Sequence, residues 1–297
     1  MMKILIADGL DAQGIKGLQA MGHQVEDLSA LPKEELVTKV ADFDILVVRS
    51  ATKVRKEMID NMKSMKMIIR GGVGMDNIDA DYAKAKGIKV VNTPGASSAS
   101  VAELALAHMF ALSRGIAKAT KSIQGGQWEK KAFKGTEISG KTLGIIGIGR
   151  IGQELAKRAN ALGMTVLGYD PNVKGTGSIK NATFDELLQS SDYISIHTPL
   201  TAETKHFIGK TEFDKMKKGA IVVNCARGGT VDESALLEAL KSGKLAGAGL
   251  DVFETEPPAA SELLSFPNVT LTPHIGAQTG EAQTRIGEEV VKIVKQA

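Results

Sequence analysis

Cysteine is almost missing from this sequence, because Cys225 is the single example among 297 residues. One thiol excludes an intrachain disulfide framework and is typical of a reducing compartment, so we expect a cytoplasmic location. Long apolar runs are missing as well, since none approaches the about 20 residues that a helix needs to cross a bilayer. The apolar segment Lys3–Ala7 is too short for the core of a signal peptide. We therefore expect a protein without a membrane partner.

A surplus of one charge is missing too. The 37 lysines and arginines are nearly balanced by 34 aspartates and glutamates, which leaves a net charge of only +3. This balance does not favour a nucleic-acid surface, and we expect no nucleic-acid partner. Cysteine, histidine and acidic residues also lack the spacing of a metal site, so we predict none.

Short apolar runs alternate with amphipathic helical patterns along most of the chain. Continuous Val, Ile and Leu runs between such helices predict an α/β protein whose parallel sheets are covered on both faces. Ten predicted strands are many for a single sheet, which favours two sheets and two domains. The predicted strands are Lys3–Ala7, Asp44–Arg49, Met67–Arg70, Lys89–Asn92, Thr142–Gly147, Thr165–Asp170, Tyr193–His197, Ala220–Asn224, Gly247–Val252 and Val269–Thr272.

A break in regular structure separates the first group of strands from the rest. The segment Thr93–Ser98 is rich in turn-forming residues. Ser100 and Glu103 then have the spacing of a capping box, which predicts a helix with Ser100 as its N-cap. Gly115 can end this helix.

The motif Gly147-x-Gly149-x-x-Gly152 has the spacing of a dinucleotide-binding turn. It follows a predicted strand and opens a predicted helix, and Asp170 lies about 20 residues further on, at the end of the next strand. Gly147 allows a tight turn, Gly149 lets the backbone approach a pyrophosphate, and Gly152 lets helix and strand pack closely. Asp170 would bind the ribose hydroxyls and repel a 2′-phosphate. The motif therefore predicts NAD, in preference to NADP, as the cofactor.

Three charged side chains follow later strands: Arg227, Glu256 and His274. Ligands of open α/β sheets bind outside the carboxyl ends of the strands, so we expect all three to face one cleft. Arginine offers a planar fork for a carboxylate, and histidine moves protons near neutral pH when a carboxylate orients it. Each residue alone suits an ordinary loop. Together with the glycine motif, they predict oxidation of a 2-hydroxy acid by a nicotinamide.

The sequence resembles the D-isomer-specific 2-hydroxyacid dehydrogenase family along nearly its whole length. The matching segments are Gly147–Gly152, Asp170-Pro171, His197–Leu200, Asn224–Gly229, Asp251–Pro257 and Pro273–Ala277. Three earlier segments are most similar to the D-3-phosphoglycerate dehydrogenase branch of the family. These are Val48–Thr52, Arg70–Asn77 and Asn92–Ser98.

This resemblance implies two Rossmann- or flavodoxin-like, doubly wound parallel-sheet domains with a cleft between them. A discontinuous substrate-binding domain would comprise residues 1–96 and 278–297, and an NAD-binding domain residues 97–277. The implied activity is NAD-dependent oxidation of D-3-phosphoglycerate to 3-phosphohydroxypyruvate, for serine biosynthesis, by a homodimer. The chain stops after the predicted helix Glu281–Lys295, so we expect no C-terminal regulatory domain and no serine feedback through one.

The resemblance also implies residue roles. His274 would exchange a proton with the substrate hydroxyl, Glu256 would be its partner, and Arg227 would bind the substrate carboxylate and C2 oxygen. The NAD site would be lined by Gly147, Gly149, Arg150, Ile151, Gly152, Asp170, Thr198, Pro199, Cys225, Ala226, Asp251 and Gly276. The substrate would be bound by Arg49, Ser50, Arg70, Val73, Gly74 and Arg227.

Several alternatives stay open. Arg49 ends an early strand beside Ser50, and we favour a phosphate or carboxylate role over a surface salt bridge; Arg70 suits either role. A phosphate-free substrate would need Arg49 less, so another family member acting on glycerate, hydroxypyruvate or D-lactate is the first alternative. The second is a non-catalytic NAD-sensing corepressor of the same fold, which the intact Arg227, Glu256 and His274 set disfavours.

For two further residue patterns we prefer a structural interpretation to a functional one. Cys225 lacks the His and Asn partners of a nucleophile, so we expect a small buried residue beside the nicotinamide. The lysines that follow Trp128 are typical of a solvated face, and a phosphate contact across a dimer interface is their alternative role.

Overall fold

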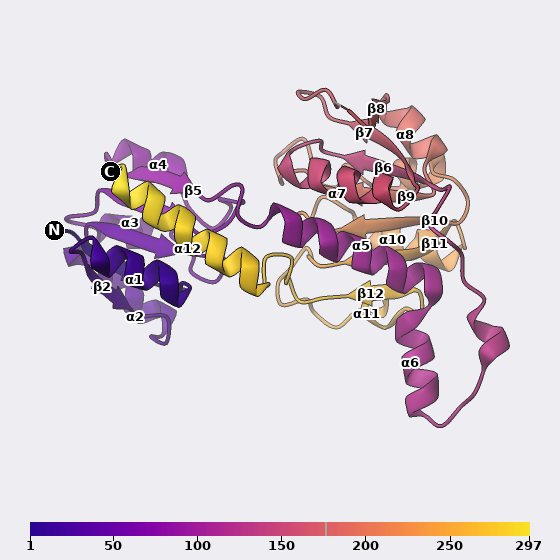
Figure 1. Ribbon diagram of the computed structural model, residues 1–297, viewed down its shortest axis with the longest axis horizontal. Helices are drawn as coiled ribbons and strands as arrows, with labels where there is room; N and C mark the ends of the chain where they lie inside the picture. Colours follow the sequence, from indigo (N-terminus) through magenta and orange to yellow (C-terminus); the bar gives the residue numbers. More distant parts are fainter. Residues whose placement is uncertain (176) are drawn as a thin grey trace. The chain divides into compact units, whose positions relative to one another are not determined.

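The computed structural model describes residues 1–175 and 177–297, which form two compact units (Figure 1). One unit contains Met1–Ser98 and Ala277–Ala297, and the other contains Ala99–Gly276. In each unit a parallel sheet has an apolar core and helices on both of its faces. The predicted α/β class with two doubly wound sheets is therefore confirmed.

The first unit alternates strands and helices, and a helix from the far end of the chain completes it. Its described elements are β1 (Lys3–Ile6), α1 (Ala12–Ala20), β2 (Gln24–Asp27), α2 (Lys33–Lys39), η1 (Val40–Asp42), β3 (Ile45–Val48), α3 (Lys56–Asp60), β4 (Met67–Arg70), α4 (Ala80–Ala85), β5 (Lys89–Asn92) and α12 (Gly280–Lys295). The strand order β2-β1-β3-β4-β5 is that of flavodoxin-like folds.

Side-chain alternation along the strands builds two cores in this unit. Leu5 packs with residues of α2, α3 and α4, whereas Ile4 and Ile6 pack with residues of α1 and α12. Figure 1 shows α12 beside α1 on the same side of the sheet. The two helices approach closely because glycines meet there: a Cβ added to Gly14 would lie 2.8 Å from the Cα of Gly287.

The second unit begins with a long helix and continues as a larger sheet. Its described elements are α5 (Ser98–Arg114), α6 (Ile116–Gln124), η2 (Lys130–Phe133), β6 (Thr142–Ile146), α7 (Arg150–Ala161), β7 (Thr165–Tyr169), β8 (Ile179–Asn181), α8 (Phe184–Ser190), β9 (Tyr193–Ile196), α9 (Lys210–Lys215), β10 (Ala220–Asn224), α10 (Glu233–Lys241), β11 (Leu245–Leu250), α11 (Glu262–Ser265) and β12 (Val269–Leu271). The order β12-β11-β10-β9-β6-β7-β8 contains the Rossmann arrangement around β6.

Each predicted strand overlaps an observed one, but the prediction omitted β2 and β8. Both are edge strands of their sheets. Their sequences, Gln-Val-Glu-Asp and Ile-Lys-Asn, are mostly polar because an edge strand is buried less than a central one. An apolar run is therefore a poor signal for such strands.

The predicted N-cap at Ser100 is wrong. The helix α5 already begins at Ser98, so Ser100 lies inside its first turn. The buried Ser100 Oγ donates to the carbonyl oxygen of Gly276 at 2.6 Å instead. A tertiary partner thus replaces the local cap. The predicted end of this helix is correct, since Gly115 adopts a left-handed conformation with φ of 60° directly after Arg114.

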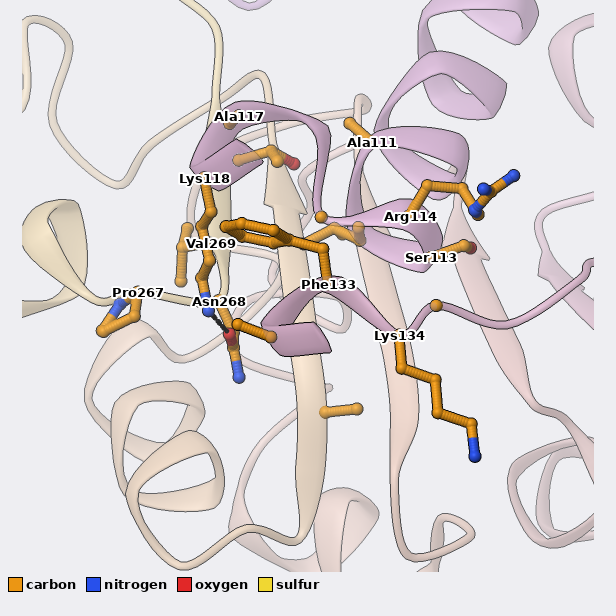
Figure 2. A pocket seen from close by; sticks show the side chains of 16 residues that line it. Ala111, Ser113, Arg114, Ala117, Lys118, Phe133, Lys134, Pro267, Asn268 and Val269 are labelled. Carbon is orange, nitrogen blue, oxygen red and sulfur yellow. Dashed lines mark hydrogen bonds between the residues drawn. The ribbon is translucent and has the colours of Figure 1, made fainter. Parts of the chain in front are cut away.

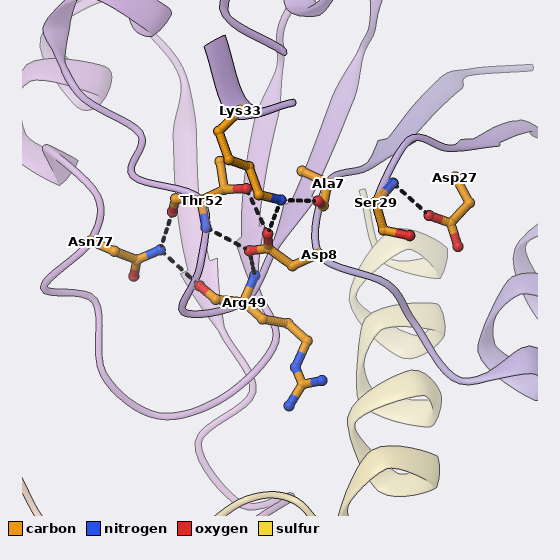
Figure 3. A network of polar contacts seen from close by, with 8 residues as sticks. All are labelled: Ala7, Asp8, Asp27, Ser29, Lys33, Arg49, Thr52 and Asn77. Carbon is orange, nitrogen blue, oxygen red and sulfur yellow. Dashed lines mark hydrogen bonds and ion pairs between the residues drawn. The ribbon is translucent and has the colours of Figure 1, made fainter. Parts of the chain in front are cut away.

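A buried carboxylate organises the loop after β3 (Figure 3). Asp8 accepts hydrogen bonds from the Arg49 amide at 2.7 Å, the Thr52 amide at 3.0 Å and the Thr52 hydroxyl at 2.6 Å. Lys33 Nζ lies 2.8 Å from Oδ1, the oxygen that also accepts from the Thr52 hydroxyl. Burial alone would raise the pKa of Asp8, but Lys33, Thr52 and Arg49 together hold it below its usual value.

Replacing Asp8 with Asn is expected to lower the free energy of unfolding at pH 7 by about 1.5–3 kcal/mol, because hydrogen bonds to a charged acceptor are lost. A carboxylate with a lowered folded pKa stabilises above its unfolded pKa, near 4, and that stability is lost as the pH falls through the folded pKa. Urea denaturation should therefore show that the difference in free energy of unfolding between the parent and Asp8→Asn becomes smaller below pH 4. Asp81→Asn, at a fully exposed aspartate of the same unit, is the control. A difference that persists at pH 2 would contradict the assignment.

Candidate active site

The predicted site segments of the second unit lie at one edge of its sheet. The strands are parallel, and their registers pair Ile146 with Tyr169 and with Ile196. Asn224 pairs in turn with Ile196 and with Leu250. The residues that follow these strands therefore come together at the carboxyl edge. This is where open α/β sheets bind ligands.

The glycine turn after β6 has the backbone that the motif predicts. Gly147 has a φ of 95°, and a Cβ there would lie 2.7 Å from the carbonyl oxygen of His197. A Cβ on Gly152 would lie 2.3 Å from the carbonyl oxygen of Gly147, so helix α7 can pack closely only with glycine at this position. A Cβ on Gly149 would meet no described atom within 4 Å, which leaves open space beside the turn.

That open space lies at the N-terminus of α7. Helix N-termini carry unpaired amides and partial positive charge, and Gly149 as N-cap offers no side chain to occupy them. Arg150 and Ile151 form the first turn of the helix. The turn therefore fits the pyrophosphate of a dinucleotide.

Asp170 follows β7 and is held in place by backbone amides. Its Oδ2 accepts from Ile148 at 3.0 Å, and its Oδ1 accepts from Asn172 at 2.8 Å and from Val173 at 3.0 Å. A carboxylate has about four acceptor positions, so these three bonds leave room for a ribose hydroxyl.

The segment after β9 contributes Thr198 and Pro199. In the described part of the chain the buried Thr198 hydroxyl has no hydrogen-bond partner, so this polar atom is available to a ligand. The neighbouring His197 is partly buried, and burial lowers its pKa to about 4. His197 is therefore neutral near pH 7, and its Nε2 lies 2.9 Å from Ser195 Oγ.

The segment after β10 is shaped by Asn224, which the sequence analysis did not single out. Its Oδ1 accepts from the Ala226 amide at 3.0 Å, and its Nδ2 donates to the carbonyl oxygen of Arg227 at 3.0 Å. Arg227 Nη1 donates to the carbonyl oxygen of Ala226 at 2.5 Å. Burial and the charge of Asp251 raise the pKa of Cys225, so its thiol stays protonated as expected for an inert cysteine.

His274 and Glu256 form a direct pair, with His274 Nδ1 2.8 Å from Glu256 Oε2. Burial alone would raise the pKa of Glu256, but the His274 hydrogen bond, the Phe253 amide and the charge of Arg227 lower it. Glu256 therefore remains ionised, and all three residues of the predicted catalytic set interact. His274 has a φ of 53°, which is rare for a residue with a side chain.

Asp251 holds the loop that carries His274. Its Oδ1 accepts from the Thr272 hydroxyl at 2.6 Å and from the Ile275 amide at 2.8 Å. Its Oδ2 accepts from the Gly276 amide at 2.9 Å, and the residue is only 1% exposed. Asp251 was predicted to line the NAD site, and the structure adds that it supports the loop that carries His274.

The residues predicted to bind substrate, apart from Arg227, belong to the first unit. Arg49 follows β3 and Arg70 ends β4, and the two strands are paired with Val48 opposite Arg70. Burial lowers the pKa of Arg49, although the charge of Asp8 partly offsets this effect. The buried Nε of Arg49 has no hydrogen-bond partner among the described residues. Arg70 Nη1 donates to the Gly71 carbonyl at 3.3 Å.

The turn after β4 is shaped by the Arg70 side chain. A Cβ on Gly72, whose φ is 141°, would overlap the Arg70 guanidinium. The Val73 carbonyl accepts from Asn92 Nδ2 at 2.6 Å, which fixes the backbone before Gly74. Ser50, after β3, is exposed.

Among the described residues, no three or more His, Cys, Asp or Glu side chains are grouped so as to hold a metal ion. The same residues include no helix that is long and apolar enough to cross a membrane.

Residues 106–276 match the family model for the NAD-binding domain of D-isomer specific 2-hydroxyacid dehydrogenases. The chain belongs to this family. The family was predicted from the sequence, and the prediction is confirmed. Members of the family are NAD-dependent oxidoreductases, and the matched segment contains the glycine turn, Asp170 and all three residues of the predicted catalytic set. The predicted NAD cofactor is confirmed with it.

Individual relatives of this 2-hydroxyacid dehydrogenase differ in substrate and length. The chain is 50% identical over 300 residues to D-3-phosphoglycerate dehydrogenase of Methanocaldococcus jannaschii, with 99% of this chain and 57% of the relative covered. It is 51% identical over 299 residues to hydroxypyruvate reductase of Thermotoga maritima, with coverages of 99% and 98%. The chain thus spans little more than half of the first relative and nearly all of the second.

The fold of this 2-hydroxyacid dehydrogenase is also found in solved structures. An acyclic imino acid reductase in complex with NADPH and D-Arg has a TM-score of 0.92 and 32% identity, with 99% of this chain and 96% of that chain covered. Because that relative was solved with NADPH, the fold alone does not select between the two nicotinamide cofactors.

Proposed function

We propose that this 2-hydroxyacid dehydrogenase oxidises D-3-phosphoglycerate to 3-phosphohydroxypyruvate with NAD. The observation that carries the proposal is the His274–Glu256 hydrogen bond of 2.8 Å, at the sheet edge that also holds the glycine turn and Arg227. A proton acceptor, its orienting carboxylate and a cation for the substrate are what this oxidation requires. We propose serine biosynthesis as the pathway and the cytoplasm as the location.

In this reaction His274 accepts the proton of the C2 hydroxyl through Nε2. Its Nδ1 is engaged with Glu256, so the neutral ring carries its hydrogen at Nδ1 and keeps the Nε2 lone pair for the substrate. The ionised Glu256 then stabilises the positive charge on the ring. NAD, when bound at the glycine turn, supplies the acceptor for the C2 hydride.

Arg227 binds the substrate carboxylate and draws electron density from the C2 oxygen. Its backbone is fixed for this task, because Asn224 Nδ2 and Thr230 Oγ1 both donate to its carbonyl oxygen, at 3.0 Å and 2.7 Å. We propose that the backbone of Val73 and Gly74 also binds substrate. A planar guanidinium can make two parallel hydrogen bonds to a carboxylate, which sets the orientation of C2.

Arg49 supports a phosphorylated substrate. Its amide is tied to Asp8 and its carbonyl accepts from Asn77 Nδ2 at 2.7 Å, so the backbone is fixed while the side chain extends away from this network (Figure 3). A phosphate would supply acceptors for the half-buried guanidinium. We propose that Ser50 and Arg70 assist it. Hydroxypyruvate reduction is the second candidate, favoured by the nearly full-length match to the Thermotoga maritima enzyme.

A substrate panel followed by nicotinamide absorbance separates the two candidates. Arg49→Ala is expected to raise KM for D-3-phosphoglycerate roughly 10- to 100-fold, the range of a lost hydrogen bond to a charged group. KM for D-glycerate and hydroxypyruvate should stay unchanged. Arg55→Ala, at an exposed arginine of the same unit, is the matched control. Faster turnover of hydroxypyruvate than of the phosphorylated pair by the unaltered protein would favour the second candidate.

We also propose that the enzyme is a homodimer through the segment of α5, α6 and η2. In Figure 2, Phe133 lies across a pocket between α6 and the strand β12, and Lys118 Nζ donates to Asn268 at its rim. This pocket has a volume of about 190 Å³. Three apolar side chains of this segment are exposed among charged and polar ones: Ile116 is 51%, Ile123 56% and Trp128 84% exposed. A second copy would bury these side chains in an isologous contact.

Light scattering after size exclusion is expected to give twice the 31.4 kDa chain mass at micromolar concentration. Ile123→Glu should shift the protein toward monomer, because a charge buried in an apolar interface lacks a partner. Leu162→Glu, at the C-cap of α7 where the side chain is 39% exposed, should leave the mass unchanged. A monomeric parent protein would refute the proposed dimer.

A further inference from the structure

His108 is a buried polar residue on the inner face of α5, where most of the buried side chains are apolar. It is only 4% exposed, and its neighbours Ala105 and Met109 belong to the apolar core. Its Nδ1 lies 2.7 Å from Thr270 Oγ1 and its Nε2 lies 3.1 Å from Thr272 Oγ1. Burying an imidazole is unfavourable unless both nitrogens are satisfied, as they are here. The ring thereby reaches the end of β12.

The hydrogen bonds around the ring have only one consistent direction. Thr272 Oγ1 donates its single hydrogen to Asp251 Oδ1 at 2.6 Å, so it can only accept from His108. His108 Nε2 therefore carries the hydrogen, and Nδ1 accepts from the Thr270 hydroxyl. Burial lowers the pKa of His108, partly opposed by the charge of Asp251, which favours this neutral form.

The chain of bonds continues to the acid–base residue. Asp251 accepts from the amides of Ile275 and Gly276, which directly follow His274. The His274 amide itself donates to the Asp251 carbonyl oxygen at 2.8 Å. Three consecutive backbone amides are thus held by Asp251, and they fix the rare left-handed conformation of His274.

Glycines make room for this arrangement. A Cβ on Gly249 of β11 would lie 2.7 Å from the Cβ of His108, so the ring fits only because this residue is glycine. A Cβ on Gly276 would lie 3.1 Å from Asp251 Oδ2 and 3.2 Å from a methyl group of Val101. The helix α5 therefore contacts both ends of the His274 loop, through Ser100 at Gly276 and through His108 at Thr272.

We propose that His108 is a positioning residue for the acid–base loop, acting through Thr272 and Asp251. It does not touch the substrate. It holds the Thr272 hydroxyl so that its hydrogen points to Asp251, and Asp251 in turn keeps His274 in the conformation that pairs with Glu256. This inference rests on the proposed function only in taking His274 as the proton acceptor.

The test compares His108→Leu with two variants. His108→Leu removes both nitrogens and is expected to lower kcat about 10-fold, since displacement of a catalytic group by about 1 Å can cost up to 10²-fold. KM for the hydroxy acid should stay within about twofold, because Arg227 is untouched. His108→Gln, whose amide can donate to Thr272, should restore most of kcat. Met109→Ala, on the same buried face, should lower stability without lowering kcat.

Amide hydrogen exchange gives a readout that does not need activity. Ile275 and Gly276 should exchange faster in His108→Leu than in the parent or in His108→Gln, while the β6 and β10 amides keep their protection. If His108→Leu does not fold, Thr272→Val breaks the same chain and should give the same two effects.

The outcomes separate this inference from the proposed function. An inactive parent protein would refute the proposed function, and the exchange data would still decide the role of His108. Loss of kcat and faster exchange of the His274 loop, both reversed by Gln, would support the inference. The inference would be overturned if His108→Leu and Met109→Ala gave the same kcat and the same exchange rates, or if His108→Gln had a kcat no higher than that of His108→Leu. In either case His108 would only fill space in the core.

Discussion

Replacing His274 with Gln is expected to lower kcat by roughly 10²–10⁴-fold, the range of general acid–base catalysis. Glutamine can still donate a hydrogen bond to Glu256, but it cannot accept the hydroxyl proton. NAD binding should persist, since the glycine turn and Asp170 lie on other loops. Stopped-flow single turnovers together with nicotinamide titration would measure the two effects separately.

The chain offers a close control for this variant. His206 also has a positive φ, of 52°, and its Nε2 lies 3.0 Å from the carboxylate of Glu254. Its exposure resembles that of His274, with side chains 39% and 36% exposed. His206→Gln should leave kcat unchanged, because no role in the reaction is proposed for His206. If His274→Gln turns over as fast as His206→Gln, His274 is not the proton acceptor.

Replacing Asp170 with Ala is expected to reduce kcat/KM for NAD by roughly 10- to 100-fold, from about 1.5–3 kcal/mol for a hydrogen bond to a charged group. The substitution should also lower the ratio of kcat/KM with NAD to kcat/KM with NADP. In NADP a phosphate dianion replaces the hydroxyl that would donate to Asp170, and Lys174 is the nearest cation downstream in the sequence. Asp170→Asn keeps an oxygen acceptor and removes the charge, so it separates repulsion from hydrogen bonding. Equal use of both cofactors by the parent, or an unchanged ratio in the variants, would show that Asp170 does not contact the ribose.

Periodic features of the fold were predictable, because buried parallel strands such as Ile45–Val48 and Ala220–Asn224 are apolar at nearly every residue. The glycine turn was predictable because, like an apolar strand, it is encoded by residues that are close together in the sequence. Strand β2 was missed because its polar residues suit a sheet edge. The start of α5 was misplaced because Ser100 bonds Gly276, which is 176 residues away in sequence.

The supporting side chains of the site could not be predicted for the same physical reason. Asp8 contacts a loop more than 40 residues away, and His108 contacts threonines more than 160 residues away. No local pattern encodes such pairs. Asn224 left a weak signal as a polar residue that ends a buried strand before Arg227 and two glycines. Three-dimensional proximity alone shows what these residues hold in place.

Because helix α12 lies at the C-terminus, the first unit is the first to be synthesised but the last to be completed. Residues 1–98 leave the ribosome first, yet Ile4 and Ile6 lack the cover of Ile286, Val290 and Val294 until the last helix of the unit is made. The segment Ala99–Gly276 holds its own core and can fold while one face of the earlier sheet has the cover of α1 but not yet that of α12. A nascent chain stalled before Gly280 would therefore expose an apolar sheet face, the kind of surface that chaperones bind and that aggregates when left uncovered.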